Sequence, residues 1–174
     1  MKLKTYAVVC VSVLVLASQL AAFDGQRKGF ILGGGAGGGS LSWSEPLLDF
    51  SKGFFATDFI IGYAPSNSLE IYYTNNVNWF TYGGESYLLG VSGVGLTKYL
   101  NREGKGFCIL GGVGVSVLSL YSGYYTSSDT GFGALAGVGY DFAKHWRIQA
   151  GVMYTSIHES TSWSFRGTIN VIAF

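Results

Sequence analysis

Three runs in the C-terminal part of the sequence decide the fold: GFGALAGVGYDF at residues 131–142, WRIQAGVMYT at residues 146–155 and SWSFRGTINV at residues 162–171. In each run, apolar or aromatic residues alternate with glycine, small polar or charged residues. Successive side chains of a β-strand point to opposite faces, so a period of two predicts strands rather than helices. The sequence therefore predicts consecutive strands with one apolar face and one small, polar face.

The composition of the two faces indicates which of them points inward. A soluble antiparallel sheet would bury its apolar face and leave the charged face in water. Here the polar face is mostly glycine and small residues, which fit a narrow, crowded interior, so we expect the apolar face to point outward into lipid. The whole chain agrees with this, because its 174 residues include 27 glycines, 16% aromatic residues and only 12% charged residues.

The first 22 residues have the features of a secretory signal peptide. Two lysines precede a short apolar run, and small residues follow it up to Ala22, after which we expect cleavage, with Ser18 and Ala21 as alternative sites. The remaining domain, residues 23–174, contains no apolar run of about 18 residues, so no transmembrane helix is predicted. It keeps Cys108 as its single cysteine, which excludes an intramolecular disulfide.

The domain also lacks the sequence signs of several ligand classes. Nine Lys and Arg against ten Asp and Glu give no basis for a nucleic-acid partner. No His, Cys or Asp residues have metal-ligand spacing, so neither a metal nor a cofactor is predicted. The glycine run at residues 33–39 is not followed by a helix pattern, so we interpret it as part of a tight barrel wall rather than a dinucleotide-binding loop.

Eight alternating runs follow the signal peptide, at residues 28–42, 53–64, 68–77, 86–99, 105–120, 131–142, 146–155 and 162–171. Long connections are predicted at residues 43–52, 75–85 and 121–130, a moderate one at 157–161, and short turns elsewhere. The fourth run changes phase between Val91 and Val94, which a bulge near Gly93 would reconcile. An open sheet edge is costly in lipid, so the strands must close. We predict an all-β, eight-stranded antiparallel up-and-down transmembrane β-barrel, with short turns facing the periplasm and longer loops outside.

A signal peptide, eight such strands, short turns on one side and the final Phe174 together resemble the small outer-membrane β-barrels of Gram-negative bacteria, namely OmpA-type barrel domains and OmpX-like and OmpW-like proteins. The resemblance implies a monomer in the cell outer membrane, in contact with membrane lipid and lipopolysaccharide. It also implies that Phe174 is the signal read by the barrel-assembly machinery. Phe174 departs from the phase of its strand, so either a bulge lies near Ile172 or the signal is atypical.

Charged residues on the inward face predict an ion-pair network that fills the lumen, made by Asp58, Glu70, Asp141, Arg147 and Arg166. Asp141 and Arg147 flank the turn at residues 143–145, which places them opposite one another on paired strands. Asp58 and Arg166 come within two strands when the barrel closes. An eight-stranded barrel is only wide enough for its own side chains, so we predict a plugged lumen rather than a pore.

The outward aromatic residues sort into two bands, as expected of the girdles at the two membrane interfaces. The predicted girdle residues are Tyr63, Tyr99, Tyr140 and Trp146 near the short turns, and Tyr87, Tyr154 and Trp163 near the long loops. We interpret these rings as membrane anchors rather than as a ligand cage.

The sequence favours a non-enzymatic protein with a structural or surface-interaction role through its outer loops, but three alternatives stay open. His158 and Ser160 resemble the catalytic pair of outer-membrane lipid A deacylases, although no acidic residue follows Ser160 as it does in those enzymes. The lumen could instead form a narrow pore for small molecules. A soluble, secreted ligand-binding barrel is the third alternative.

Overall fold

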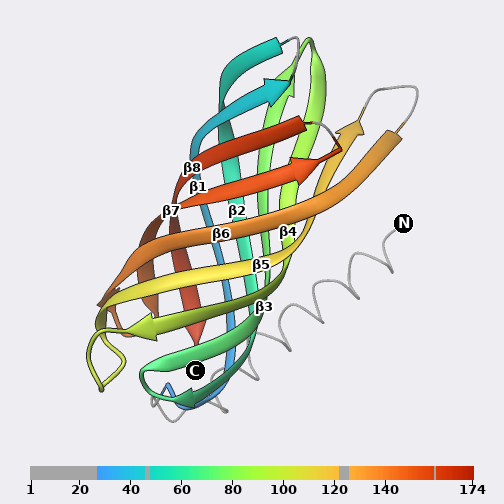
Figure 1. Cartoon of the computed structure of the whole chain (residues 1–174). Coiled ribbons are helices and arrows are strands. Elements are labelled where there is room, and N and C mark those ends of the chain that lie inside the picture. The colour runs from blue at the N-terminus through green and yellow to red at the C-terminus, as the bar shows by residue number, and fades with distance from the viewer. Residues whose placement is uncertain (1–26, 46–47, 122–125, 159) are drawn as a thin grey trace, which may run out of the picture.

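The computed structural model describes residues 27–45, 48–121, 126–158 and 160–174. Eight strands form this part: β1 (Gly29–Glu45), β2 (Leu48–Ser66), β3 (Leu69–Tyr82), β4 (Glu85–Tyr99), β5 (Gly106–Tyr121), β6 (Thr126–Ala143), β7 (Trp146–Ile157) and β8 (Ser160–Ala173). Each strand pairs antiparallel with the next, and β8 pairs with β1 to close the barrel (Figure 1). The predicted eight-stranded antiparallel barrel is confirmed. The predicted signal peptide at residues 1–22 lies outside the described residues.

The two ends of the barrel differ from the predicted arrangement of long and short connections. At the termini end, where β1 begins and β8 ends, the strands are joined at residues 67–68, 100–105 and 144–145. At the opposite end, called the hairpin end, they are joined at residues 46–47, 83–84, 122–125 and 158–159. The prediction of long loops at residues 43–52, 75–85 and 121–130 is therefore wrong, because most of these residues belong to the strands. The longest connection, residues 100–105, lies at the termini end, where short turns were expected.

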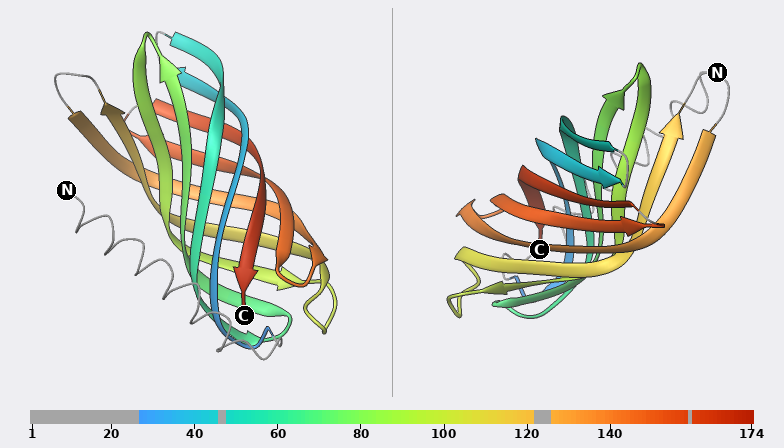
Figure 2. Two further views of the ribbon diagram at one scale, coloured as in Figure 1. Left: turned by 180° about the vertical axis from the view of Figure 1, so that it is seen from behind. Right: turned by 45° about the horizontal axis from the view of Figure 1, so that its top comes forward.

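The β3–β4 hairpin illustrates why these strands are longer than predicted. Alternation continues past Val77, with Trp79 exposed on the outer wall and Phe80 buried inside. The strands then reverse at Gly83 and Gly84, whose φ angles are 61° and 86°. Positive φ at both central residues is what a two-residue turn matched to the twist of its strands requires. The β1–β2 and β3–β4 hairpins consequently project beyond the β7–β8 hairpin (Figures 1 and 2).

The outer wall carries large apolar and aromatic side chains around the whole barrel. Exposed examples from every strand are Phe30, Phe59, Tyr73, Val94, Leu96, Ile109, Val113, Val138, Ile148 and Ile169. The inward faces carry the predicted glycines, small polar residues and charges. Within the described residues, no helix is long and apolar enough to cross a membrane.

The β4 strand corrects the prediction of a bulge near Gly93. Its register with both β3 and β5 is continuous from Ser86 to Lys98. Leu89 and Val91 are fully buried inside the barrel, whereas Val94 is exposed on the outer wall. The apolar residues of β4 face inward in the hairpin half, where the interior is apolar, and outward in the other half, where the interior is polar. The extra residue of a bulge is therefore not needed to explain the change of phase. The β8 strand likewise has no bulge near Ile172, since its register with β1 continues to Ala173.

Two apolar clusters occupy the interior. The larger one, at the hairpin end, contains Leu41, Trp43, Phe54, Ala56, Phe80, Leu89, Val91, Met153 and Ile157. The smaller one, at the termini end, contains Ile31, Ala64, Tyr72, Ile172 and Phe174. The polar and charged residues lie mainly between them and at the termini end, so only part of the lumen is polar.

Glycine allows the strands to approach closely at specific positions in the wall. A Cβ added at Gly37 would overlap the carbonyl oxygen of Gly167 on β8, and a Cβ added at Gly114 would overlap the carbonyl oxygen of Ser92 on β4. No other residue fits these positions without a backbone shift. This confirms the interpretation of the glycine run at residues 33–39 as barrel wall.

Candidate functional site

The most distinctive polar feature is a buried cluster of charges at the termini end. Arg147, on β7, is only 2% exposed, and its Nη2 donates to both carboxylate oxygens of Glu70 at 3.1 Å. Its Nε donates to Asp141 Oδ1 at 2.9 Å. Asp141 and Arg147 are cross-strand partners on β6 and β7, as the spacing around their turn predicted. Three of the five predicted lumen residues are thus brought together.

A second arginine, Arg27, completes this cluster. Arg27 precedes β1, and its Nη1 donates to Glu70 Oε1 at 2.6 Å while its Nη2 pairs with Asp141. Its Nε donates to the Gly104 carbonyl at 3.0 Å, which ties it to the connection between β4 and β5. Two arginines therefore balance two carboxylates. Buried charges need such pairing and hydrogen bonding to be tolerated.

Sequence reasoning missed Arg27 because it lies outside the alternating pattern of the first strand. One sequence signal could have identified it. The predicted lumen set has three acids, Asp58, Glu70 and Asp141, but only two arginines. An interior that excludes water cannot keep an unpaired carboxylate at low cost, so a third cation was required. Arg27 is that cation.

Two aromatic rings enclose the Arg27 guanidinium. Its central carbon lies 4.3 Å from the Tyr99 ring centroid and 4.3 Å from the Phe174 ring centroid. Tyr99 also donates its hydroxyl to Asp141 Oδ2 at 2.8 Å and accepts a hydrogen bond from Arg147. The rings exclude water from the ion pairs and add cation–π attraction.

The placement of Tyr99 corrects one of the predicted girdle residues, and Tyr87 corrects another. Tyr99 is 2% exposed and lies inside the barrel. Tyr87 stacks on the buried Phe80, with ring centroids 5.4 Å apart, and packs against the apolar cluster at the hairpin end. Both residues lie on β4, where the odd-numbered positions face inward because the strand has no bulge.

The other predicted girdle residues lie on the outer wall. Tyr63, Tyr140 and Trp146 are exposed toward the termini end. Trp163 is exposed and contacts the half-buried Tyr154, with centroids 4.9 Å apart, toward the hairpin end.

A second ion pair lies midway along the lumen. Arg166 Nη2 donates to Asp58 Oδ1 at 2.5 Å, across the β1–β8 seam. Asp58 also accepts hydrogen bonds from Gln149 at 2.9 Å and from Thr168 at 2.6 Å. Two cavities of about 20 Å³ lie beside these residues, each with room for roughly one water molecule. All five predicted lumen residues therefore point inward, in two separate clusters rather than one network.

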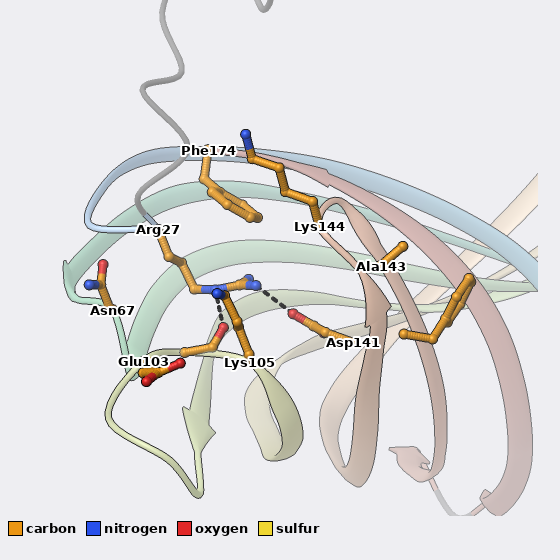
Figure 3. Close-up of a pocket in the computed structure, with 10 residues that line it drawn as sticks. Arg27, Asn67, Glu103, Lys105, Asp141, Ala143, Lys144 and Phe174 are labelled. Carbon is orange, nitrogen blue, oxygen red and sulfur yellow. Dashed lines mark hydrogen bonds and ion pairs between the residues drawn. The ribbon is translucent and has the colours of Figure 1, made fainter.

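An open cavity of about 650 Å³ lies at the termini end, next to the Arg27 cluster (Figure 3). Arg27, Asp141 and Phe174 form its inner boundary, and Lys105 and Lys144 line it from the connections at residues 100–105 and 144–145. Phe174 points inward and is 6% exposed, with its ring 4.8 Å from that of His145. Its role as an assembly signal stays a prediction.

His158 and Ser160, the candidate catalytic pair, lie at the β7–β8 connection of the hairpin end. His158 is highly exposed, adopts a φ of 53°, and has its Nε2 3.5 Å from Asp129 Oδ1 on β6. Ser160 begins β8 and is paired with Ile157. Glu159 lies outside the described residues. An acidic residue is therefore near the histidine, contributed by another strand rather than by the sequence after Ser160.

No protein-family model and no curated protein sequence matches this chain. Solved structures are similar in fold. Ail, the attachment invasion locus protein of Yersinia pestis, superposes with a TM-score of 0.63 at 12% identity, over 83% of this chain and 99% of that chain.

Two further structures agree with this comparison. Neisserial surface protein A gives a TM-score of 0.58 at 18% identity, over 83% of this chain and 97% of that chain. The N-terminal β-barrel domain of Pseudomonas aeruginosa OprF gives a TM-score of 0.53 at 12% identity, over 83% of this chain and 98% of that chain. This chain therefore shares the eight-stranded fold of small bacterial outer-membrane β-barrels, as the sequence resemblance predicted.

Proposed function

We propose that this chain is an integral, non-enzymatic protein of the bacterial outer membrane, with a closed lumen and a structural or surface-interaction role at its hairpin end. The observation that carries the proposal is the orientation of the side chains. Exposed apolar residues cover the outer wall around the whole barrel, while Arg27, Arg147 and Arg166 are paired with carboxylates inside. Such a wall is stable against hydrocarbon and would be an aggregation surface in water.

The lumen has two barriers in series, which argues against the narrow-pore alternative. The ion pairs of Arg27, Arg147 and Arg166 fill the polar part. On the hairpin side of these ion pairs, the apolar cluster that includes Leu89 and Met153 fills the lumen with buried side chains. An ion crossing this second barrier would lose its hydration without a polar replacement.

The hairpin end supports the proposed surface role. In the described part of the chain its exposed charged groups include Lys52 on β2, Asp129 on β6 and His158 at the β7–β8 connection. Ail has been solved with the heparin analogue sucrose octasulfate and in a phospholipid bilayer nanodisc. By analogy we propose that this chain is a monomer that contacts outer-membrane lipid and lipopolysaccharide, and that the assembly machinery inserts it.

Cell fractionation combined with heat-modifiable gel mobility tests this proposal. We expect the protein in the outer-membrane fraction, with an unheated band that migrates differently from the boiled band because the closed barrel resists detergent. A protein that stays in the aqueous fraction without detergent would contradict the proposal and support the soluble alternative.

The lipid-modifying alternative has one structural observation in its favour, the contact between His158 and Asp129. An acid beside a histidine can orient the ring and stabilise its charged form while it activates a serine. Lipid A acylation should be compared between cells that make the native protein and cells that make the Ser160→Ala variant. We expect identical acyl patterns, and a change that depends on Ser160 would overturn the non-enzymatic proposal.

A further inference from the structure

The termini end of the barrel carries an excess of exposed positive charge. Among the described residues, its exposed charged side chains are the five cations Lys28, Lys98, Arg102, Lys105 and Lys144 and one acid, Glu103. Within the part of the chain that the structure describes, none of these five cations forms an ion pair. The three buried arginines, in contrast, are all paired with carboxylates. This cationic collar, defined by the five exposed cations, therefore has its charge available for a partner.

Two members of the cationic collar line the open cavity at this end. Lys105 and Lys144 lie on neighbouring connections and contribute to the same cavity of about 650 Å³, together with Asn67, Glu103 and Phe142 (Figure 3). Arg27 and Asp141 at its inner boundary are already paired with one another. Beside that pair, the cavity thus combines two ammonium groups, the Glu103 carboxylate, the Asn67 amide and two phenylalanine rings, with room for a small polar group.

The outer wall beside this cavity carries two pairs of exposed aromatic rings. Phe107 and Tyr140 lie 4.8 Å apart, and Phe142 and Trp146 lie 6.4 Å apart, measured between ring centroids. Lys105 precedes Phe107 by two residues, and Lys144 lies between Phe142 and Trp146 in the sequence. Each lysine is therefore placed at the level where an aromatic girdle meets the headgroups of a bilayer.

We propose that the cationic collar binds the phosphate headgroups of anionic phospholipids in the leaflet at the termini end, with Lys105 and Lys144 holding one headgroup at the mouth of the cavity. This inference rests on the proposed membrane location. The phosphate accepts from the lysine ammonium groups, while the acyl chains lie against the aromatic pairs and the apolar wall below the headgroup. Lys98, which is exposed on β4, donates its amine to Ser68 Oγ at 3.1 Å, in the connection between β2 and β3 at this end.

The position of the charges favours a lipid over a dissolved anion. A free phosphate would need only the two lysines and the cavity. The cationic collar involves several connections at the termini end, and the wall next to it is apolar, which matches a surface of headgroups with attached chains. Glu103 reduces the local charge without reversing it, because two unpaired lysines share its cavity.

Trp146 provides a local probe for a test in lipid vesicles. In the Trp79→Phe/Trp163→Phe background, Trp146 is the remaining tryptophan on the outer wall, since Trp43 is buried inside. Its fluorescence is measured in phosphatidylcholine vesicles that contain a small fraction of brominated phosphatidylglycerol or of brominated phosphatidylcholine. We expect the brominated anionic lipid to bind about fivefold more strongly than the zwitterionic one, and this preference to fall at high salt.

The Lys105→Gln/Lys144→Gln variant should abolish the preference, whereas Lys52→Gln at the hairpin end should keep it. In the reciprocal Trp79→Phe/Trp146→Phe background, Trp163 should report no preference. Equal quenching by both lipids in the native charge state, or a preference that survives the double lysine substitution, would overturn the inference. Insertion into the bilayer is measured independently of lipid preference, by quenching with brominated phosphatidylcholine and by heat-modifiable mobility. A protein that shows neither signal is not inserted, which would contradict the proposed membrane location. A protein that is inserted but shows no preference for the anionic lipid would contradict only the proposed role of the cationic collar.

Discussion

Arg27 and Phe174 meet across the seam of the barrel, with the guanidinium carbon 4.3 Å from the centroid of the phenylalanine ring. One residue precedes β1 and the other follows β8. The last ladder pair between these strands at this end is Leu32 with Ala173, so the first three residues of β1 have no β8 partner. The stacked pair therefore continues the closure of the seam beyond the hydrogen-bonded ladder, and the ion pairs of Arg27 hold it in place.

Arg27→Met should destabilise the barrel by about 3–5 kcal/mol, because it leaves Glu70 and Asp141 with one cation between them. The free energy of unfolding can be measured by guanidinium titration of the vesicle-inserted protein. Lys28→Met, at the neighbouring exposed position, should change it by less than about 0.5 kcal/mol. Adding Glu70→Gln to Arg27→Met should recover part of the loss. Equal effects of Arg27→Met and Lys28→Met would contradict a structural role for the ion pairs.

Tyr99→Phe tests the correction of Tyr99 from membrane girdle to interior. The variant removes the hydroxyl that donates to Asp141 and accepts from Arg147, and the loss of hydrogen bonds to charged groups costs about 1.5–3 kcal/mol. Tyr140→Phe is the matched control, since Tyr140 is exposed on the outer wall and should tolerate the loss of its hydroxyl. Unfolding titrations of the two variants decide the question, and a larger effect at Tyr140 would restore Tyr99 to the girdle.

The alternation of residue types was enough to predict the strands and most of their faces, because side chains along each strand of a barrel point alternately to the outer wall and to the interior. It failed where the interior changes character. On β4, Leu89 and Val91 face inward like Tyr99, since the hairpin half of the lumen is apolar. A pattern that equates apolar with outward cannot distinguish that change from a bulge.

The candidate site shows a second limit. Asp141 and Arg147 could be paired from sequence because they flank one turn, so their contact is local. Arg27 reaches Glu70 and Asp141 only after the barrel has closed, and it comes from a segment with no alternation. Its presence could be inferred from the charge imbalance of the predicted lumen, but its contacts depend on the tertiary structure.

Arg166→Ala should leave the protein non-conducting. The substitution removes the ion pair to Asp58 and opens space midway along the lumen, but the apolar cluster at the hairpin end still closes the path. Single-channel recordings in planar bilayers should therefore show no current for the native protein or for Arg166→Ala. Combining Arg166→Ala with Leu89→Gly and Met153→Gly opens the middle and the hairpin half, but it should still give no current, because the ion pairs of Arg27 and Arg147 remain across the termini end. Steady conductance from Arg166→Ala alone would show that the ion pair is the only gate.

Gly114→Ala should lower the free energy of unfolding by about 1–3 kcal/mol, as overpacking does in tightly packed cores. The added Cβ would overlap the carbonyl oxygen of Ser92 on β4. Gly111→Ala, three residues earlier on β5, meets its nearest neighbour, the Leu135 carbonyl oxygen, at an ordinary 3.5 Å. It should be neutral or slightly stabilising, because alanine restricts the unfolded chain. Parallel unfolding titrations test this contrast, and equal losses would mean that contact with β4 does not set the requirement for glycine.

Val113→Arg tests the orientation of the whole barrel. Val113 is 56% exposed on the outer wall, on β5 between the two aromatic bands. An arginine there would face the middle of the bilayer and should cost about 2–4 kcal/mol. Thr130→Arg, on the exposed hairpin end of β6, adds the same charge where water is available and should change stability little. Unfolding from vesicles should therefore separate the two variants. If Val113→Arg is as stable as Thr130→Arg in vesicles, hydrocarbon does not surround this wall, since a desolvated guanidinium could not be accommodated without a measurable loss.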